Sequence, residues 1–306
     1  MKNAIEIYDI NKSYKNKPAL KNINLHVEPG EIFGLIGPDG AGKTTLIRIL
    51  TTLLLADSGT AIVNGSDIVK DYKQIRATVG YMPGRFSLYQ DLTVEENMNL
   101  FAKIFGTSIA ENYSLVADIY SQIEPFKDRQ AGQLSGGMKQ KLALSCALIH
   151  KPDVLFLDEP TTGVDPVSRK ELWDMLKKLK NEGITVFVST AYMDEATLCD
   201  RVALIQDGVL LSVDSVDGII DSFKKKLISV KSDDIYRLIG DLRKLDFVEK
   251  AYPFGDCVHT ILLDTNEDEA TIMSALETLK HNNLSAKQVI PTVEDCFIDL
   301  MENHNG

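Results

Sequence analysis

The segment GPDGAGKTT (37–45) is the part of this sequence that decides the fold. It fits the pattern G-x-x-x-x-G-K-[ST] and lies between an apolar run, IFGLIG (32–37), and a helix-forming run, LIRILTTL (46–53). Glycines at such a strand-to-helix turn let backbone N–H groups point inward, and the helix N-terminus adds about half a positive charge. The pattern predicts a loop that holds phosphate groups at the edge of an α/β sheet.

Two side chains at the end of this loop carry further predicted chemistry. Lys43 is expected to bring a mobile positive charge to the β- and γ-phosphates of a nucleotide. Thr44 is expected to offer its hydroxyl group to Mg²⁺. The loop therefore predicts a site for a magnesium-bound nucleotide.

A second segment, VLFLDEP (154–160), places two adjacent carboxylates at the end of a hydrophobic strand. The carboxyl edge of a parallel sheet is where α/β proteins bind their ligands. Asp158 is expected to reach Mg²⁺ through the water shell of the ion, and Glu159, which points elsewhere, is expected to polarise the attacking water. Taken alone, the pair fits two solvated acids at a strand end equally well.

A third segment, LSGGMKQK (134–141), predicts a second anion site. Ser135 is expected to cap a helix whose first turn contains Gly136 and Gly137, so that N–H donors at the helix N-terminus stay open. In isolation this pattern favours a capped core helix with nothing bound. The three segments occur in one chain in the order 37–45, 134–141 and 154–160, and that combination favours a nucleotide site.

Length and composition exclude several classes of protein. A chain of 306 residues predicts roughly two domains, it has no apolar run of the ~18–20 residues that span a bilayer, and MKNAIEIYDI (1–10) is not a signal peptide. A net charge of −11 argues against binding to nucleic acid or directly to anionic lipid. The four cysteines form no CxxC pair, which predicts reduced thiols in the cytosol.

Short apolar runs alternate with amphipathic helices through residue 225. Five runs predict a parallel sheet: IFGLIG (32–37), VGYM (79–82), VLFLD (154–158), ITVFV (184–188) and VALI (202–205). AIEIYDI (4–10) and the turn at Asn64-Gly65 predict antiparallel pairing instead. A capping box at Thr93-Val-Glu-Glu96 begins a helix-rich insertion. The predicted first domain is therefore 1–225, with a helical subdomain at about 93–150.

The pattern changes after the lysines at 224–226. Strands are expected at LISVKS (227–232), VEKAYPFG (248–255), CVHTILLD (257–264) and SAKQVIP (285–291), and helices at 233–245, 267–282 and 292–302. The order βαββαβ plus a helix predicts a small α+β ferredoxin-like domain over 226–306. This domain contains no recognisable catalytic group of residues.

The first 215 residues or so resemble the nucleotide-binding subunit of an ATP-binding cassette (ABC) transporter. GPDGAGKTT is similar to the Walker A motif, LSGGM to the signature, VLFLDEP to the Walker B motif and TTGVDP (161–166) to the D-loop. PTVEDCFIDLM (291–301) and RFSLYQDLTVEEN (85–97) are similar to segments of drug-resistance and multidrug-type exporter ATPases. The resemblance implies the P-loop NTPase cassette of that family: an α/β fold with a mixed sheet core, an antiparallel β subdomain and a helical subdomain.

The resemblance also implies the cofactors ATP and Mg²⁺ and a head-to-tail dimer, in which the signature of one subunit closes over the ATP that the other holds. Tyr14 lies where the family places an aromatic residue to stack on adenine, and Glu159 is the implied catalytic residue. Implied ATP contacts are Tyr14, Gly37, Pro38, Asp39, Gly40, Ala41, Gly42, Lys43, Thr44, Thr45, Ser135, Gly136, Gly137 and Asp165, with metal contacts at Thr44 and Asp158.

Two positions depart from the family pattern. STAYMDEA (189–196) has Ala191 where the family has a switch histidine, and YMPGRF (81–86) has Gly84 where the family has a glutamine. Both lost groups normally address metal, water or terminal phosphate, so we expect ATP binding to survive and hydrolysis to slow by about 10²–10³-fold for one lost donor. Three explanations stay open: slow hydrolysis, compensation by neighbours such as Thr190 or Tyr192, and pairing with an intact second subunit. Restoring both residues is expected to speed hydrolysis in the first case.

The function expected from the resemblance is that of an ATP-hydrolysing subunit that energises a separate membrane permease, for export of drugs or other small hydrophobic molecules. Expected partners are the permease and a second copy of the chain, with no nucleic acid, at the cytoplasmic face of the membrane. The alternative is a soluble cassette ATPase with no transport role. Members of that kind generally carry two cassettes or basic extensions, and this acidic chain has one cassette.

Overall fold

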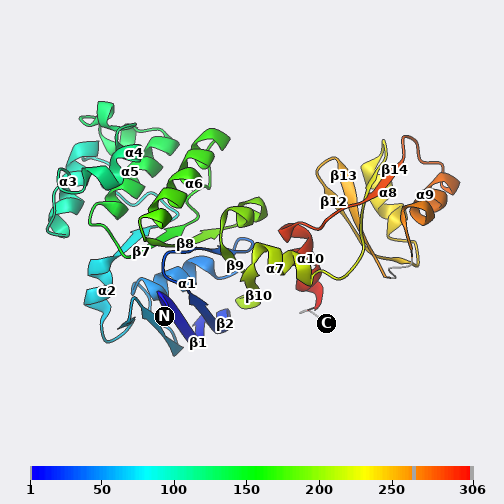
Figure 1. Ribbon diagram of the computed structural model, residues 1–306, viewed down its shortest axis with the longest axis horizontal. Coiled ribbons are helices and arrows are strands. Elements are labelled where there is room, and N and C mark those ends of the chain that lie inside the picture. The colour runs from blue at the N-terminus through cyan, green and yellow to red at the C-terminus, as the bar shows by residue number, and fades with distance from the viewer. Residues whose placement is uncertain (1, 264–266, 304–306) are drawn as a thin grey trace. The chain divides into compact units, whose positions relative to one another are not determined.

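A six-stranded sheet lies at the centre of the first part of the chain (Figure 1). Its strand order is β10 (Val209–Ser215), β9 (Arg201–Gln206), β3 (Ile32–Ile36), β8 (Thr185–Thr190), β7 (Val154–Asp158) and β6 (Val79–Met82). Only β10 is antiparallel to its neighbour, across the turn at Asp207-Gly208. The predicted parallel strands are confirmed.

The three central strands, β3, β7 and β8, are buried along their whole length, which explains why they read as continuous apolar runs. Phe33, Phe156 and Phe187 come from these three strands, and the ring centroids of neighbouring pairs are 5.6 Å apart. Helices α1 (Lys43–Leu50), α2 (Tyr72–Thr78) and α6 (Pro166–Asn181) provide connections between strands. The rigid centre of the fold therefore carries the loops that follow β3, β7 and β8 at one edge.

A separate antiparallel sheet has the order β2 (Lys17–Val27), β1 (Ile5–Tyr14), β4 (Ser58–Val63) and β5 (Ser66–Asp67). Asn64 and Gly65, with φ values of 46° and 77°, form the turn between β4 and β5. Two consecutive residues with positive φ are typical of a type I′ hairpin turn. This antiparallel part of the fold agrees with the prediction.

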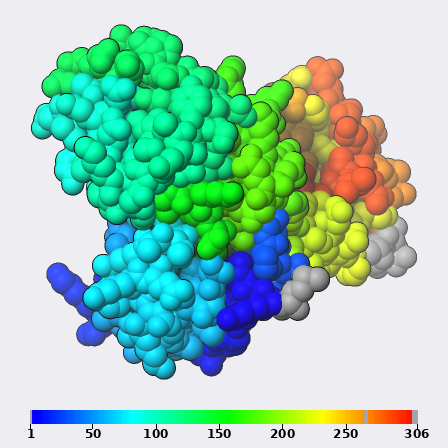
Figure 2. Space-filling model, turned by 60° about the vertical axis from the view of Figure 1, so that its left-hand side comes forward, coloured from blue at the N-terminus to red at the C-terminus, as the bar shows by residue number. Residues whose placement is uncertain are grey.

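The helical subdomain contains α3 (Val94–Ile104), α4 (Tyr113–Tyr120), two short 3₁₀ turns, η1 (Glu124–Phe126) and η2 (Ala131–Gln133), and α5 (Gly136–Leu148). Thr93 accepts a hydrogen bond from the Glu96 backbone at 3.1 Å, and the Glu96 carboxylate accepts one from the Thr93 backbone at 2.8 Å, so the predicted capping box is present. In Figure 2 this segment forms a lobe of its own, coloured cyan to green.

The computed structural model describes residues 2–263 and 267–303 and has two compact units, 2–216 with 300–303, and 217–299. Residues 217–225, which include most of helix α7 (Val216–Ser222), belong to the second unit although the prediction places them in the first domain, and residues 300–303 of the predicted second domain belong to the first unit. In the part of the chain that is described, no helix is both long and apolar enough to cross a membrane.

The second unit contains a four-stranded antiparallel sheet with the order β12 (Val248–Phe254), β13 (Cys257–Leu262), β11 (Leu227–Lys231) and β14 (Ser285–Gln288). Helices α8 (Ile235–Leu242) and α9 (Glu269–Thr278) share one core with this sheet, and α10 (Val293–Asn303) follows. The elements from β11 to β14 come in the order βαββαβ. Assignment to a ferredoxin-like fold stays a prediction, and residue 264 of the expected strand 257–264 lies outside the described residues.

Candidate active site

The loop between β3 and α1 is held against two neighbouring segments that leave no room for side chains. A Cβ atom at Gly37 would lie 2.1 Å from the carbonyl oxygen of Ile205, and one at Gly42 would lie 2.5 Å from that of Ala19. Gly42 also has a φ of 111°, which residues other than glycine rarely adopt. The glycines are therefore required by the packing of the loop, as well as by any ligand.

Lys43 is buried at the base of this loop, with only 3% of its surface exposed. Its Nζ donates hydrogen bonds to the carbonyl oxygens of Gly37 at 2.7 Å and Pro38 at 3.0 Å, and lies 3.1 Å from Oε1 of Glu159. The ammonium group is thus fixed between the loop and the acidic residue that follows β7. An uncompensated buried charge would be unfavourable, and these three oxygens supply the compensation.

A pocket of about 320 Å³ opens beside the lysine. Its lining residues are Tyr14, Lys17, Pro18, Ala19, Gly40, Gly42, Lys43, Thr44, Thr45 and Glu159. Tyr14 is 46% exposed and lies at the end of β1, where it pairs with Lys17 across a two-residue turn. The structure therefore brings the predicted aromatic residue to the same pocket as the loop.

Sequence reasoning missed three residues of this pocket, Lys17, Pro18 and Ala19. They follow Tyr14 after a hairpin turn at Lys15 and Asn16, whose φ values are 45° and 67°. A Lys-Asn pair between two strands is a recognisable turn signal, and it indicates that the next strand begins beside Tyr14. That signal was sufficient to find them.

Asp158, the last residue of β7, is buried next to two hydroxyl groups. Its Oδ1 accepts hydrogen bonds from Ser189 at 2.8 Å and from Thr44 at 3.1 Å. Burial raises the pKa of Asp158 above its ordinary value, and the two hydroxyl groups oppose that effect only in part. Because Asp158 has few hydrogen-bond donors, a bound cation would stabilise its ionised form.

Glu159 adopts a left-handed backbone conformation with a φ of 52°, uncommon for a non-glycine residue. Its backbone N–H donates to both the carbonyl and the hydroxyl oxygen of Ser189, each at 3.1 Å. Its carboxylate lies between Lys43 and the hydroxyl group of Thr162, which donates to Oε2 at 3.4 Å. The unusual backbone turns Glu159 away from the direction of Asp158 and toward the pocket that it lines.

The predicted residues of the LSGGM segment lie away from this pocket. Ser135 caps α5 by accepting a hydrogen bond from the backbone of Met138 at 3.3 Å. A Cβ atom at Gly136 would meet nothing within 4 Å, so the start of the helix faces open space. The 320 Å³ pocket is lined only by residues that the structure describes, and Ser135, Gly136 and Gly137 are not among them. Gly136 instead lines a second pocket of about 180 Å³, which Glu159 also borders.

Asp165 is likewise separate from the pocket and has a capping role at α6. Its Oδ1 accepts hydrogen bonds from the backbones of Ser168 at 3.0 Å and Val167 at 3.1 Å. These bonds stabilise the charged form, so the pKa of Asp165 is lowered. The structure gives this residue a place at a helix N-terminus and no contact with the loop.

Comparison with known proteins gives the family. Residues 20–162 match the family model described as ABC transporter. The Nod factor export ATP-binding protein I of Paraburkholderia xenovorans (strain LB400) is 36% identical over 301 residues, which cover 97% of this chain and 96% of that protein. The chain belongs to the ABC transporter ATP-binding proteins. The resemblance predicted from the motifs is confirmed.

Other members of the ABC family agree with this assignment. The probable multidrug ABC transporter ATP-binding protein YbhF of Escherichia coli (strain K12) is 39% identical over 94% of this chain, which spans about half (50%) of the length of YbhF. A solved ATP-binding subunit of an ABC transporter covers 72% of this chain and 93% of its own, with 28% identity and a TM-score of 0.67. A dimeric cassette in a post-hydrolysis state, MJ0796 bound to ADP and Pi, covers 69% of this chain and 98% of its own, with 26% identity and a TM-score of 0.63. The predicted cassette fold and the ABC-type ATPase assignment are confirmed.

Ala191 follows β8, the strand that pairs with β3 beside the glycine loop. It follows Thr190 at the end of β8, and the carbonyl oxygen of Thr190 accepts a hydrogen bond from Gly37 N–H at 3.2 Å. The residue before that, Ser189, contacts both Asp158 and Glu159. Position 191 is therefore next to the phosphate loop, and alanine contributes no polar group there.

Gly84 lies close to the backbone of the acidic pair. A Cβ atom at this position would lie 2.9 Å from the carbonyl oxygen of Asp158 and 3.8 Å from Cβ of Glu159. A side chain at position 84 therefore requires the backbone to move. The expectation that a glutamine can simply be restored at this position needs revision, since the present backbone is arranged for a glycine.

Proposed function

We propose that this ABC ATPase is the energising subunit of an exporter, and that it hydrolyses MgATP to drive a separate membrane permease. The observation that carries the proposal is the convergence of Lys43, Thr44 and Glu159 on one pocket beneath a glycine loop. The names of the two relatives, a probable multidrug transporter subunit and a Nod factor export subunit, support export, and we infer that the cargo is a drug or another small hydrophobic molecule.

Three sets of groups in the pocket bind the nucleotide. Backbone N–H groups of residues 37–45 and the N-terminus of α1 hold the phosphates, and Lys43 neutralises their charge. Tyr14, exposed at the pocket mouth, stacks on the adenine ring. Lys17, on the opposite strand of the same hairpin, adds a second positive charge near the phosphates.

The residues present fit a Mg²⁺ ion that arrives with the nucleotide. Thr44 Oγ1 and Asp158 Oδ1 lie 3.1 Å apart and would hold it, a hydroxyl and a carboxylate being oxygen ligands that suit this ion. Mg²⁺ usually keeps several waters and substrate phosphate oxygens as its other ligands. When bound, the ion neutralises charge on the transferring phosphoryl group.

Glu159 is the catalytic residue in this account. Its carboxylate borders the pocket, where it can orient the attacking water, and before nucleotide binds it is paired with Lys43 and accepts a hydrogen bond from Thr162. A phosphate that pairs with Lys43 releases Glu159 from that ion pair. The base then becomes available at the point at which substrate is bound.

A second copy of the chain completes the site. Ser135, Gly136 and Gly137 form an open helix N-terminus that lies outside the pocket of their own subunit, and Asp165 caps the neighbouring helix. In a head-to-tail dimer these groups close over the ATP of the partner subunit and add N–H donors to its γ-phosphate. The permease holds this dimer at the cytoplasmic face of the membrane.

Ala191 and Gly84 set the rate of this reaction below that of a cassette with both polar side chains. A missing preorganised donor lowers turnover by about 10²–10³-fold unless a neighbour replaces it, while ATP binding depends on other groups. An intact second subunit at the dimer interface would restore the faster rate in a heterodimer.

The proposal is tested by measuring ATP hydrolysis by the purified chain alone and with the permease that co-purifies with it. We expect slow hydrolysis alone, stimulation by the permease, and none of either for Lys43→Ala. Hydrolysis that Lys43→Ala leaves intact would overturn the phosphate-loop role. An active chain that associates with no membrane protein would favour the soluble, non-transport alternative.

A further inference from the structure

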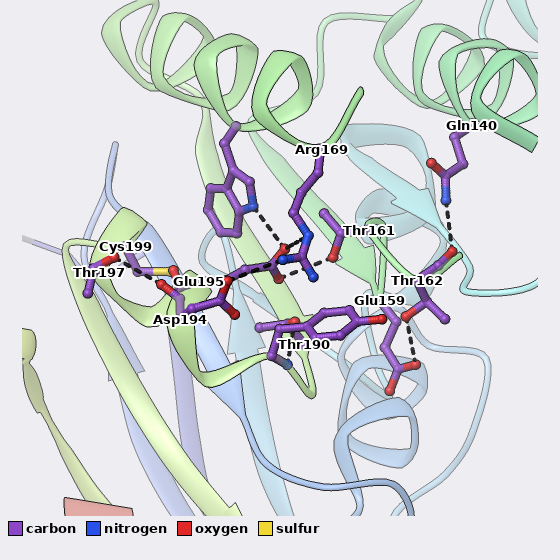
Figure 3. Close-up of polar contacts among 12 residues, drawn as sticks. Gln140, Glu159, Thr161, Thr162, Arg169, Thr190, Asp194, Glu195, Thr197 and Cys199 are labelled. Atoms are coloured by element: carbon purple, nitrogen blue, oxygen red, sulfur yellow. Dashed lines mark hydrogen bonds and ion pairs between the residues drawn. The ribbon is translucent and has the colours of Figure 1, made fainter. Parts of the chain in front are cut away.

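The segment that follows Glu159 is fixed by side chains from three other elements. Ser189 of β8 accepts hydrogen bonds from the Glu159 backbone. Gln140 of α5 donates from Nε2 to the carbonyl oxygen of Thr162 at 3.3 Å, and Thr161 donates from Oγ1 to Oε2 of Glu195 at 3.1 Å (Figure 3). Thr162 in turn contacts the Glu159 carboxylate. The position of the catalytic carboxylate therefore depends on how this segment is held.

Glu195 is the buried anchor of the segment. It lies in the short 3₁₀ helix η3 (Met193–Leu198), and only 1% of its surface is exposed. Oε1 of Glu195 accepts a hydrogen bond from Trp173 Nε1 at 3.2 Å and is 3.1 Å from Nε of Arg169, while Oε2 binds Thr161. A buried carboxylate needs such partners, and Arg169 supplies its positive charge.

Arg169 connects this anchor to the residue beside Ala191. Its guanidinium carbon lies 4.1 Å from the centroid of the Tyr192 ring, and Nη1 is 3.2 Å from Oδ2 of Asp194. The Tyr192 backbone donates to the Thr190 hydroxyl at 3.0 Å, which fixes the turn after β8. One planar cation thus joins helix α6, the turn after β8 and the segment after β7.

We propose that Arg169 is a positioning residue for ATP hydrolysis, holding Glu159 in place through Glu195 and Thr161 and the turn at Ala191 in place through Tyr192. The inference rests on the proposed function, because it assigns a role in hydrolysis by the same site. Arg169 touches neither Glu159 nor the pocket. It acts on the orientation of the base, which is a different requirement from the contact with metal, water or terminal phosphate expected of a polar side chain at position 191.

The test compares kcat, KM and the equilibrium Kd for MgATP of the full chain, with its permease, in five forms: parent, Arg169→Ala, Tyr192→Leu, Tyr192→Phe and Lys170→Ala. Tyr192→Phe keeps the aromatic ring, and Lys170→Ala removes a positive charge from the exposed side of the same helix turn. Arg169→Ala and Tyr192→Leu should lower kcat at least fivefold with KM and Kd within twofold. Both controls should match the parent.

A smaller loss of kcat in Tyr192→Leu, or a parallel loss of MgATP affinity, would overturn the inference, because a structural role alone affects both constants. Arg169→Ala leaves Glu195 buried without its cation, so this variant can fail to fold. In that event the kcat, KM and Kd of Tyr192→Leu alone test the inference. A loss in Tyr192→Phe equal to that in Tyr192→Leu assigns the effect to the hydroxyl group and also overturns it. A parent chain without ATPase activity contradicts the proposed function itself, which distinguishes the two failures.

Discussion

Asp158 of the first unit and Asp295 of the second are both buried carboxylates, with 3% and 0% of their surface exposed, but their surroundings differ. Asp158 accepts hydrogen bonds from two hydroxyl groups. Asp295 accepts them from Tyr252 at 2.7 Å, from the backbone and side chain of Thr292 at 2.7 Å each, and has His259 Nδ1 at 2.7 Å. Asp158 has two donors, whereas Asp295 has three donors together with a histidine nitrogen.

The pKa values reflect that difference. Burial raises the pKa of both acids, and at Asp158 burial prevails. At Asp295 the hydrogen bonds from His259, Thr292 and Tyr252 together outweigh burial, so the pKa is lowered. A buried acid whose hydrogen-bond donors all come from the protein is therefore structural. A buried acid with fewer donors beside a pocket is available to a ligand.

Removing the charge of Lys43 should have the largest effect of all these changes, and the effect should be on MgATP binding. Lys43→Ala is expected to weaken MgATP binding about 100-fold or more, since several charge-assisted hydrogen bonds to phosphate are lost together. Isothermal titration calorimetry measures the change. Lys21→Ala, which removes an exposed lysine of β2 outside the pocket lining, is the matched control and should change the affinity less than about twofold. Equal losses of affinity in both variants would mean that Lys43 has no specific role in binding the phosphates.

Asp158→Asn should separate activity from stability. We expect turnover to fall about 100-fold because the Mg²⁺ ligand loses its charge, while the asparagine oxygen can still accept from Thr44 and Ser189. The nucleotide-free fold should be at least as stable as the parent near neutral pH, because a raised pKa means that ionised Asp158 is unfavourable in the folded state. Thermal unfolding without nucleotide checks the second point. A large loss of stability would place Asp158 in the same class as Asp295.

Asp295→Asn should have the opposite pattern. It replaces an acceptor by an amide whose NH₂ group faces existing donors, which should destabilise the second unit by about 2–4 kcal/mol while MgATP affinity stays within twofold. Hydrogen exchange resolved to β12 and β13 reports the local stability. The control is Asp256→Asn, an exposed acid paired with Lys231 at the surface, which should leave exchange unchanged. Unchanged exchange in Asp295→Asn would show that the buried cluster contributes little.

Lowering the pH should reproduce that loss. The folded-state pKa of Asp295 lies below the ordinary value of 3.8, so its stabilisation is complete above about pH 4 to 5 and is lost as the pH falls through the folded value. Protection of β12 and β13 should therefore drop in acid. Asp158 has the opposite sign, and its unfavourable contribution disappears as the pH falls through its raised pKa.

The smallest expected effect concerns the two departures from the family pattern. Ala191→His should raise kcat by less than about tenfold, well below the 10²–10³-fold of a single oxyanion donor, if neighbours such as Thr190 or Tyr192 already compensate for the missing histidine. Gly84→Gln should not raise kcat at all, because its Cβ would lie 2.9 Å from the carbonyl oxygen of Asp158. A 100-fold gain from Ala191→His would show that nothing in the chain compensates for the missing histidine.

Local patterns were sufficient to predict the parts of the site that depend on neighbouring residues. The loop at 37–45, the acidic pair after β7 and the cap at Ser135 each lie within one strand-to-helix or loop-to-helix segment, and their spacing fixes their geometry. The alternation of apolar runs likewise predicted the parallel sheet.

Contacts between distant segments could not be predicted in the same way. The stacking of Arg169 on Tyr192, the approach of Gly84 to Asp158 and the enclosure of Asp295 by its partners depend on how elements pack in three dimensions. Neither the charge nor the spacing of these residues indicates the partner.

The central claim is that the pocket beside Lys43 binds MgATP and that Glu159 acts only in its turnover. Measuring the Kd for MgATP and the single-turnover rate of Glu159→Gln tests both halves at once. The account predicts an affinity equal to or tighter than that of the parent, since the 3.1 Å ion pair that occupies Lys43 is weakened, together with a rate at least about 100-fold lower. A variant that hydrolyses ATP at the parent rate, or that no longer binds MgATP, would contradict it.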